Sequence, residues 1–133
     1  MIKGIGVDLV EVERMKRALG RFEKLNARLF TAKEREYCSQ KIGAYKHYAV
    51  RFAAKEAVLK AMGIGLRGVK WTDIEIDHDE LGKPLVFLKG KAAQKAAESE
   101  ICRILVSLSF SRDNAVASAI ALSEVDSKSR GGA

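Results

Sequence analysis

Two carboxylates in this sequence lie in stretches that are otherwise apolar. Asp8 lies within GIGVDLV, and Glu56 lies within RFAAKEAVL. At about 100° per residue, Glu56 falls about 40° from Phe52, in the middle of the most apolar face of its predicted helix. A buried charge without a partner is costly, so each carboxylate calls for one. A shared Mg²⁺ would serve both, because this ion is usually held by one or two carboxylates together with waters and substrate phosphates.

Two cations flank Glu56 and extend this candidate site. Arg51 and Lys60 could hold the phosphates that such an ion would bridge. This combination favours phosphoryl-type transfer from a diphosphate, in which metal and cations stabilise the charge that develops on the leaving group.

Each carboxylate also has a purely structural interpretation. Asp8 stands near a predicted strand-to-helix junction, where Asp often caps the helix N-terminus. Glu56 and Lys60 are four residues apart and could form an ordinary ion pair along one helix.

The glycine-rich segment GIGLRG at 63–68 matches GxGxxG. A dinucleotide fingerprint needs a strand before it and a helix after it, whereas here a helix precedes and a strand follows. We therefore interpret the segment as a connector after a helix stop, or as backbone lying close to a phosphate ligand.

The elements that must position these residues form an α+β pattern. Strands are predicted over 2–10, 71–78, 85–88, 103–110 and 115–122, and helices over 11–30, 31–37, 44–62 and 91–99. The order β-α-α-α-β-β-α-β-β predicts a small mixed or antiparallel sheet packed on the long helix 44–62. Gly20 is expected to split the first helix, Thr31 and Glu34 to form a capping box, and Gly63 to end the long helix. We expect one domain over 1–122 and a polar tail over 123–133.

The composition excludes several classes of protein. The chain has 133 residues, of which 47% are hydrophobic and 31% are charged, a balance typical of one globular domain. It contains no apolar run of about 20 residues, and acidic residues interrupt the N-terminal stretch too early for a signal peptide, so a soluble cytoplasmic protein is expected. Cys38 and Cys102 have no CxxC or His partner and are expected to be buried thiols.

The formal net charge of +7 calls for an acidic partner. Residues 1–60 hold 14 Lys+Arg against 7 Asp+Glu, whereas the remaining residues are balanced. The spacing on a continuous helix predicts one basic stripe of Arg14, Arg17, Arg21, Lys24 and Arg28, about 80° wide, beside an apolar face. An ordinary solvated face is the alternative. A nucleic-acid-binding module would explain the charge, but it would leave the two carboxylates without a purpose, and no reading motif is recognisable.

Five segments in this order resemble a known family. GIGVDLVEVER, RFAAKEAVLKAMG, GVKWTDIEI, GKP and VSLSFSRDNAVASAI, spread from Ile2 to Leu122, are similar to holo-acyl-carrier-protein synthase, the short bacterial-type 4′-phosphopantetheinyl transferase. The resemblance implies the fold of that family and transfer of 4′-phosphopantetheine from coenzyme A to a serine of apo-acyl carrier protein, for fatty acid biosynthesis, leaving adenosine 3′,5′-bisphosphate. It further implies Mg²⁺ as cofactor and a homotrimer with active sites at subunit interfaces, and it makes nucleic acid and membrane less favoured partners.

The resemblance also assigns site residues. It implies metal binding by Asp8 and Glu56, which act with Lys60 as the catalytic residues. The implied coenzyme A residues are Arg51, Lys60, Gly63, Pro84, Ser109 and Phe110. The implied residues for the acidic carrier protein are Arg14, Arg21, Lys24, Leu25 and Arg28. Whether Glu56 or a metal-bound water deprotonates the carrier serine stays open.

Two positions depart from the family pattern. Phe110 stands where the family usually has a His that contacts the nucleotide phosphates, and Ile64 stands where it often has Thr. We expect retained activity with altered coenzyme A affinity. The alternative is a catalytically weakened homologue that still binds carrier protein.

Overall fold

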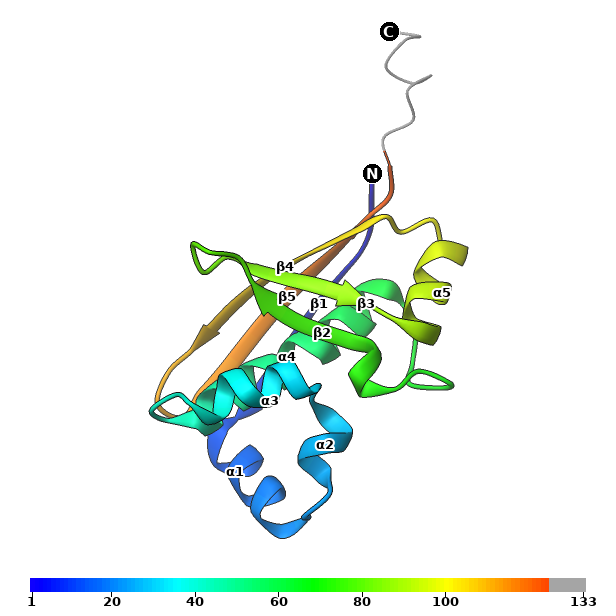
Figure 1. The fold of residues 1–133 in the computed structure, drawn as a ribbon. Helices are drawn as coiled ribbons and strands as arrows, with labels where there is room; N and C mark the ends of the chain where they lie inside the picture. Colours follow the sequence, from blue (N-terminus) through cyan, green and yellow to red (C-terminus); the bar gives the residue numbers. More distant parts are fainter. Residues whose placement is uncertain (125–133) are drawn as a thin grey trace, which may run out of the picture.

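The computed structural model describes residues 1–124, and the part of the predicted tail from residue 125 onward lies outside the described residues. The elements follow the chain in this order: β1 (Ile2–Glu11), α1 (Val12–Arg21), α2 (Leu25–Leu29), α3 (Ala32–Ser39), α4 (Ala44–Met62), the 3₁₀ helix η1 (Trp71–Asp73), β2 (Ile74–His78), β3 (Pro84–Leu88), α5 (Gly90–Glu98), β4 (Arg103–Phe110) and β5 (Asn114–Leu122) (Figure 1). The predicted α+β class and the order of strands are confirmed.

The segment 11–30 is split into two helices, but the split does not lie at the expected residue. It is divided into α1 and α2, and the break lies at 22–24 rather than at Gly20, which is helical. The turn lets the chain bend back, so that Leu29 and Phe30 are buried against the rest of the molecule. The first three residues of the predicted strand 71–78 form η1 instead, where the Asp73 carboxylate accepts a hydrogen bond from the Lys70 N–H.

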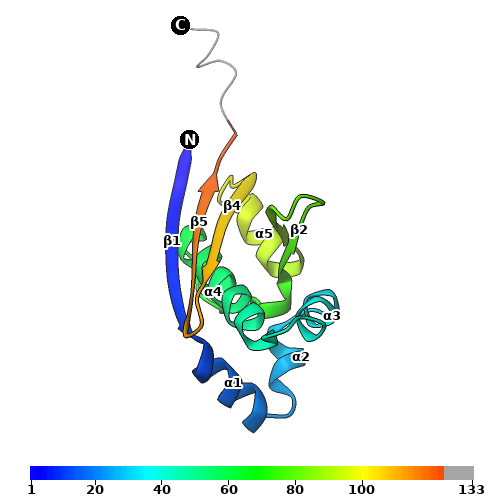
Figure 2. The same cartoon turned by 90° about the vertical axis from the view of Figure 1, so that its left-hand side faces the viewer.

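The strands form two antiparallel sheets. The three-stranded sheet has the order β1-β5-β4, and the second sheet is the hairpin β2-β3. Figure 2 shows α4 between the three-stranded sheet on one side and β2 with α5 on the other. The sheet is antiparallel throughout, and it packs on the long helix as predicted.

The helix α4 is largely buried because it is contacted from both sides. Its capping glycine Gly63 has a left-handed φ of 69°, and the Ile64 N–H bonds the Leu59 carbonyl, so the predicted end of the helix is confirmed. The core on its sheet side is built from small residues, among them Ala53, Ala57 and Ala61.

The strand β1 lies against α4 at backbone contact distance. Residues of one strand face alternate with those of the other, so Gly4, Gly6 and Asp8 share the face toward α4. A Cβ at Gly4 would overlap the carbonyl oxygen of Ala61, and a Cβ at Gly6 would overlap that of Ala57. The two glycines therefore allow this close approach.

The opposite face of β1 is apolar and exposed. Ile5, Val7 and Leu9 are 72%, 59% and 60% exposed. We refer to these three side chains as the β1 outer face.

Several smaller expectations can be compared with the structure. The capping box of Thr31 and Glu34 is confirmed. Cys38 is buried as expected, and burial raises the pKa of its thiol to about 11. The expectation for Cys102 is wrong, because this residue is exposed, directly before β4. The Ser123 N–H bonds the Met1 carbonyl and continues the pairing of β5 with β1 by one residue, so the domain boundary at residue 122 stays a prediction.

None of the helices within residues 1–124 combines the length and the apolar character needed to span a membrane.

Candidate active site

The structure brings the two predicted metal-binding carboxylates together. Asp8 lies in the middle of β1 and points to α4, where Glu56 lies. Lys60, one turn further along α4, places its Nζ 3.1 Å from Asp8 Oδ1 and 3.0 Å from the Val7 carbonyl oxygen. A strand and a helix far apart in the sequence thus supply one cluster, which we call the carboxylate pair with Lys60.

Both structural interpretations of these residues are wrong. Asp8 does not cap a helix, because it lies within β1 and the N-cap of α1 is Glu11, which makes no side-chain capping bond. Within residues 1–124, Lys60 forms its ion pair with Asp8 and not with Glu56.

The environment of Glu56 disfavours the charged form of its carboxyl group. Burial and then the adjacent Asp8 carboxylate raise the pKa of Glu56 to about 7, while Lys60 and Arg14 act in the opposite direction. Ionising two neighbouring carboxylates in a partly buried site is costly unless a cation offsets their charges.

The donor set therefore fits a hard divalent cation. Within the described part of the chain, no group of three or more His, Cys, Asp or Glu side chains could enclose a metal by itself. An ion at Asp8 and Glu56 would need waters or phosphate oxygens for its remaining ligands, which is the arrangement that Mg²⁺ favours in phosphate-handling sites.

A cavity of about 490 Å³ adjoins the carboxylate pair. It is lined by Asp8, Glu56, Arg14 and Leu25, with apolar side chains such as Phe52 completing the wall. Two residues predicted to bind the carrier protein therefore share a cavity with the two predicted metal ligands.

The predicted coenzyme A residues fall into two groups. Arg51, Pro84, Ser109 and Phe110 line a second cavity of about 460 Å³, which we call the Arg51 cavity. Lys60 and Gly63 do not belong to it. Arg51 and Lys60 lie about 180° apart around α4 and about 14 Å apart along its axis, so the helix separates the two groups.

Arg51 is a buried cation without an acidic partner among residues 1–124. Only 5% of the surface of Arg51 is exposed. Its Nε has no hydrogen-bond partner, and its Nη1 donates one long hydrogen bond of 3.5 Å to the His47 carbonyl. The guanidinium lies 4.2 Å from the centroid of the Tyr37 ring. A desolvated, unpaired guanidinium at a cavity wall is suited to a phosphate or another anion.

The predicted carrier-binding residues lie on two helices instead of one stripe. Arg14 and Arg21 belong to α1, Lys24 precedes α2, and Arg28 lies in the last turn of α2. All four are exposed, and Leu25 is half-buried. The predicted continuous stripe is wrong, because the turn at 22–24 directs Arg28 toward the segment 66–72 while Arg14 faces the carboxylate pair.

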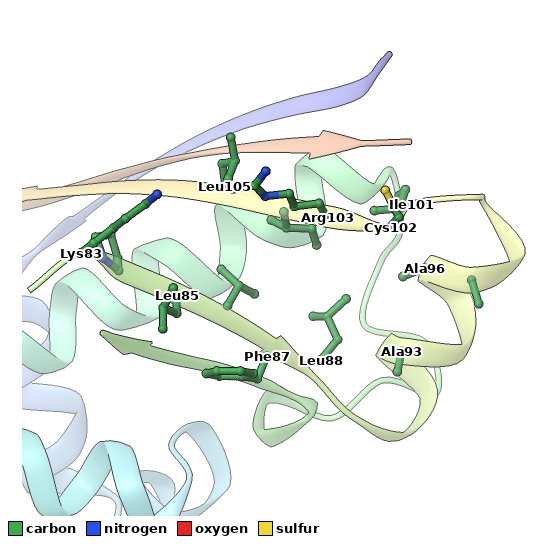
Figure 3. Close-up of a pocket in the computed structure, with 14 residues that line it drawn as sticks. Lys83, Leu85, Phe87, Leu88, Ala93, Ala96, Ile101, Cys102, Arg103 and Leu105 are labelled. Carbon is green, nitrogen blue, oxygen red and sulfur yellow. The ribbon is translucent and has the colours of Figure 1, made fainter. Parts of the chain in front are cut away.

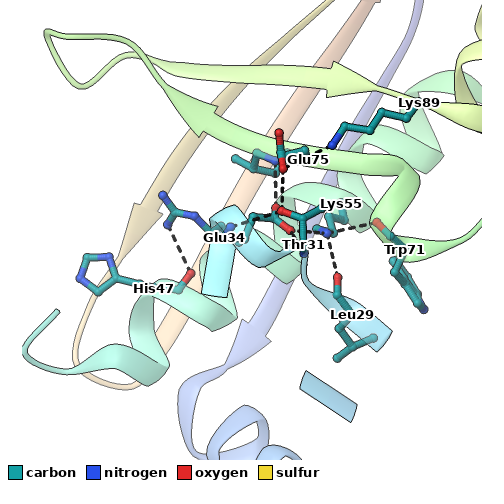
Figure 4. A network of polar contacts seen from close by, with 10 residues as sticks. Leu29, Thr31, Glu34, His47, Lys55, Trp71, Glu75 and Lys89 are labelled. Atoms are coloured by element: carbon teal, nitrogen blue, oxygen red, sulfur yellow. Dashed lines mark hydrogen bonds and ion pairs between the residues drawn. The ribbon is translucent and has the colours of Figure 1, made fainter. Parts of the chain in front are cut away.

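A buried ionic network beside the site was not predicted from the sequence. Lys55 is fully buried, and its Nζ contacts Glu34 Oε1 at 2.7 Å, the Leu29 carbonyl at 2.7 Å and the Trp71 carbonyl at 3.1 Å (Figure 4). The second oxygen of Glu34 accepts the Ile76 N–H at 2.9 Å. We call this the Lys55 network. It ties α2, α3, η1 and β2 to the helix that carries Glu56.

A third hollow, of about 550 Å³, lies between β3, β4 and α5 (Figure 3). Its wall is mostly apolar, and Lys83 and Arg103 are its charged members. Of the predicted site residues it includes only Pro84, so it brings no catalytic groups together.

The sequence of this chain matches a known protein family over most of its length. A sequence model described as the 4′-phosphopantetheinyl transferase superfamily matches residues 4–119. This chain belongs to that superfamily. The expectation that the sequence resembles it is therefore confirmed, and the match includes both carboxylates, Lys60, the Arg51 cavity and the basic helices.

Individual members of the superfamily are similar over nearly the whole chain. A holo-[acyl-carrier-protein] synthase of Desulforudis audaxviator is 50% identical over 129 residues, covering 96% of this chain and 98% of the relative. The crystal structure of the holo-[acyl-carrier-protein] synthase of Neisseria meningitidis superposes with a TM-score of 0.83 at 39% identity, covering 92% of this chain and 99% of that one. A holo-(acyl-carrier-protein) synthase of Bacillus anthracis in complex with CoA (3′,5′-ADP) superposes with a TM-score of 0.77 at 34% identity, covering 93% and 99%.

Proposed function

We propose that this chain transfers 4′-phosphopantetheine from coenzyme A to a serine hydroxyl of an apo-acyl carrier protein, in the service of fatty acid synthesis. The products are the holo-carrier protein and adenosine 3′,5′-bisphosphate. The observation that carries the proposal is the meeting of Asp8 and Glu56 beside Lys60, in a chain that matches the superfamily from residue 4 to 119. The relatives named holo-acyl-carrier-protein synthase support the choice of carrier protein as acceptor.

Magnesium is the proposed cofactor, held by Asp8 and Glu56. The raised pKa of Glu56, about 7, supports this, because a carboxyl whose charge is disfavoured by burial and by a neighbouring carboxylate would be stabilised in its charged form by a cation between the two. When bound, Mg²⁺ would act as a Lewis acid on the diphosphate and stabilise charge on the leaving group.

The residues of the chain hold and orient the reacting groups. In the reaction, the serine oxygen forms a bond to the phosphorus that carries the pantetheine arm, and the bond from that phosphorus to the bridging oxygen of the nucleotide breaks. The serine proton leaves to Glu56 or to a water. Lys60 adds positive charge beside Asp8, which offsets part of the charge of the diphosphate.

A homotrimer with active sites between subunits is also proposed. Two observations support it: α4 separates the carboxylate pair from the Arg51 cavity, so one copy alone does not offer both to one coenzyme A, and the β1 outer face exposes Ile5, Val7 and Leu9. In such an assembly, the Arg51 cavity of one subunit would face the carboxylate pair of the next. The family resemblance supports a cytoplasmic location.

A second candidate function is favoured by Phe110. This side chain is 43% exposed on the wall of the Arg51 cavity and offers no hydrogen-bond donor to a phosphate. The chain could then be a carrier-binding homologue with weakened catalysis. A large gain of activity in Phe110→His, from an inactive start, would support this candidate.

The deciding experiment is mass spectrometry of apo-acyl carrier protein incubated with this protein, coenzyme A and Mg²⁺. We expect the mass increment of one phosphopantetheine on the carrier, and its complete absence with Glu56→Gln. The matched control is Glu98→Gln on the exposed surface of α5, which should leave the increment unchanged. An unmodified carrier with the wild-type protein would refute the proposed function, and near-normal turnover by Glu56→Gln would refute the metal assignment.

A further inference from the structure

The Arg51 cavity contains more donors than the resemblance assigned to it. Besides Arg51, its wall includes the imidazole of His47, whereas the second imidazole, that of His78, places its Nδ1 3.7 Å from the Asp77 carboxylate. The acidic side chain at this wall is Asp77, which is engaged by Lys33 at 2.6 Å. The cavity therefore presents nitrogen donors without a free carboxylate, as expected for an anion site.

The side chain of His47 lies against Phe110, the residue that stands where the family usually has a phosphate-binding His. Its ring packs edge-on against Phe110, with ring centroids 5.0 Å apart. It also lies one helical turn before Arg51, about 40° around α4, so imidazole and guanidinium face the same side of the helix. Within residues 1–124 the ring nitrogens of His47 make no hydrogen bond, so they are available to a ligand.

The charges around His47 are positive. Burial, and then Arg51, Lys41 and Lys46, lower the pKa of the imidazole, so in the absence of an anion it is neutral near pH 7. A phosphate beside it would oppose these effects and favour the protonated form. The polar groups that line the cavity with His47 or act on its charge are Tyr37 from α3, Lys41 from the turn after α3, Asp77 and His78 from β2, Ser109 from β4, and Lys46 and Arg51 from α4.

We propose that His47 donates a hydrogen bond to a phosphate of the bound nucleotide, next to the phosphate contact of Arg51, and so supplies from α4 the imidazole that position 110 on β4 lacks. This inference rests on the proposed function, because that function makes the cavity a nucleotide site. It explains how a chain with Phe110 could keep its full set of phosphate donors. The side chains at positions 47 and 110 are in contact, so an imidazole at either position would reach the same part of the cavity.

The test is binding of adenosine 3′,5′-bisphosphate to the intact protein, measured by isothermal titration calorimetry. We expect His47→Phe to weaken binding about tenfold to a hundredfold, the usual range for losing a hydrogen bond to a charged group. The double variant His47→Phe/Phe110→His, which moves the imidazole to the opposite wall, should recover most of the loss. Recovery by relocation is a readout that a merely structural role of His47 would not produce.

The matched control is His78→Phe, which removes the other imidazole of the cavity. We expect a change of less than about threefold, because His78 packs at a tilt against Tyr37 beside Asp77, whereas the imidazole that packs against Phe110 is that of His47. An equal loss in both single variants, or wild-type affinity in His47→Phe, would overturn the proposal. Circular dichroism of each variant establishes that the fold is retained.

Two kinetic readouts separate this inference from the proposed function. In the carrier-modification assay, His47→Phe should raise the KM for coenzyme A while kcat stays within about threefold. Proton uptake on nucleotide binding near pH 7 should be smaller in His47→Phe than in the wild type. If the carrier is never modified but the bisphosphate results hold, the proposed function fails and the His47 site stands. If the carrier is modified and KM is unchanged, the His47 proposal alone fails.

Discussion

Replacing Lys55 by Met is expected to lower the free energy of unfolding by about 3–5 kcal/mol, the usual cost of removing one partner of a buried ion pair. The ammonium of Lys55 has three partners, Glu34 and the carbonyls of Leu29 and Trp71, and all three lose it at once. Burial lowers the pKa of Lys55, and the Glu34 carboxylate opposes this. The variant would leave that carboxylate buried with only neutral N–H donors (Figure 4).

A double-mutant cycle separates the pair from the loss of packing. Glu34→Gln removes the charge but keeps the shape, and Lys55→Met/Glu34→Gln removes both charges. We expect the double variant to be more stable than the sum of the single losses predicts, with a coupling of about 1–3 kcal/mol. Lys33→Met is the matched control: it breaks the exposed ion pair to Asp77 and should change stability far less.

The assay is urea unfolding followed by the fluorescence of Trp71, the single tryptophan of the chain, whose carbonyl belongs to the network. All variants are compared at one protein concentration, because dissociation of an oligomer would make the midpoint depend on it. A Lys55→Met protein within about 1 kcal/mol of the wild type would refute the reasoning, since a stranded buried carboxylate costs more than that. Strict additivity in the cycle would refute the coupling.

Three further predictions concern the site and its supports. Mg²⁺ should bind more tightly as pH rises from 6 to 8, because the pKa of Glu56 is raised to about 7 and its proton must leave before the ion binds. An affinity that calorimetry finds independent of pH would contradict this. Gly6→Ala should lower the melting temperature, because the new Cβ would overlap a backbone carbonyl of α4. Gly20→Ala should raise the free energy of unfolding by about 0.5–1 kcal/mol, because Gly20 lies inside α1 with open space around it. Equal effects of the two variants would contradict the packing argument. Arg21→Glu should raise the KM for an acidic carrier protein without changing the KM for coenzyme A, and a change in both would argue against a carrier-specific role.

Much of the fold was predictable because local patterns and tertiary packing agree. The strand predicted over 115–122 and the capping box predicted for Thr31 and Glu34 are both present in the structure. The break at 22–24 was not predictable in this way, because Gly20 is the weakest helix former nearby and yet remains helical. The bend is decided by the burial of Leu29 and Phe30 against distant residues.

The candidate site was predictable where an apolar context made a charge conspicuous. Asp8 and Glu56 stood out for this reason. Lys55 did not, because a lysine beside Glu56 looks like an ordinary charged helix residue, and its carbonyl partners lie 26 and 16 residues away. The separation of Arg51 from Lys60 follows from helix geometry alone, but its meaning depends on which elements cover each side of α4.

The backbone contact at Gly4 and Gly6 has a consequence for ion selection. At Gly4 and Gly6, β1 meets α4 mainly through main-chain atoms of Ala57 and Ala61, so a larger residue at either glycine would force the two elements apart. The close approach of β1 to α4, the two elements that carry Asp8 and Glu56, therefore depends on Gly4 and Gly6, four and two residues before Asp8. At the metal site proposed above, a rigid pair of carboxylates would suit the strict octahedral geometry of Mg²⁺ better than the more adaptable coordination of Ca²⁺. The discrimination between these ions would then reside in two glycines, and mutating the carboxylates would not reveal it.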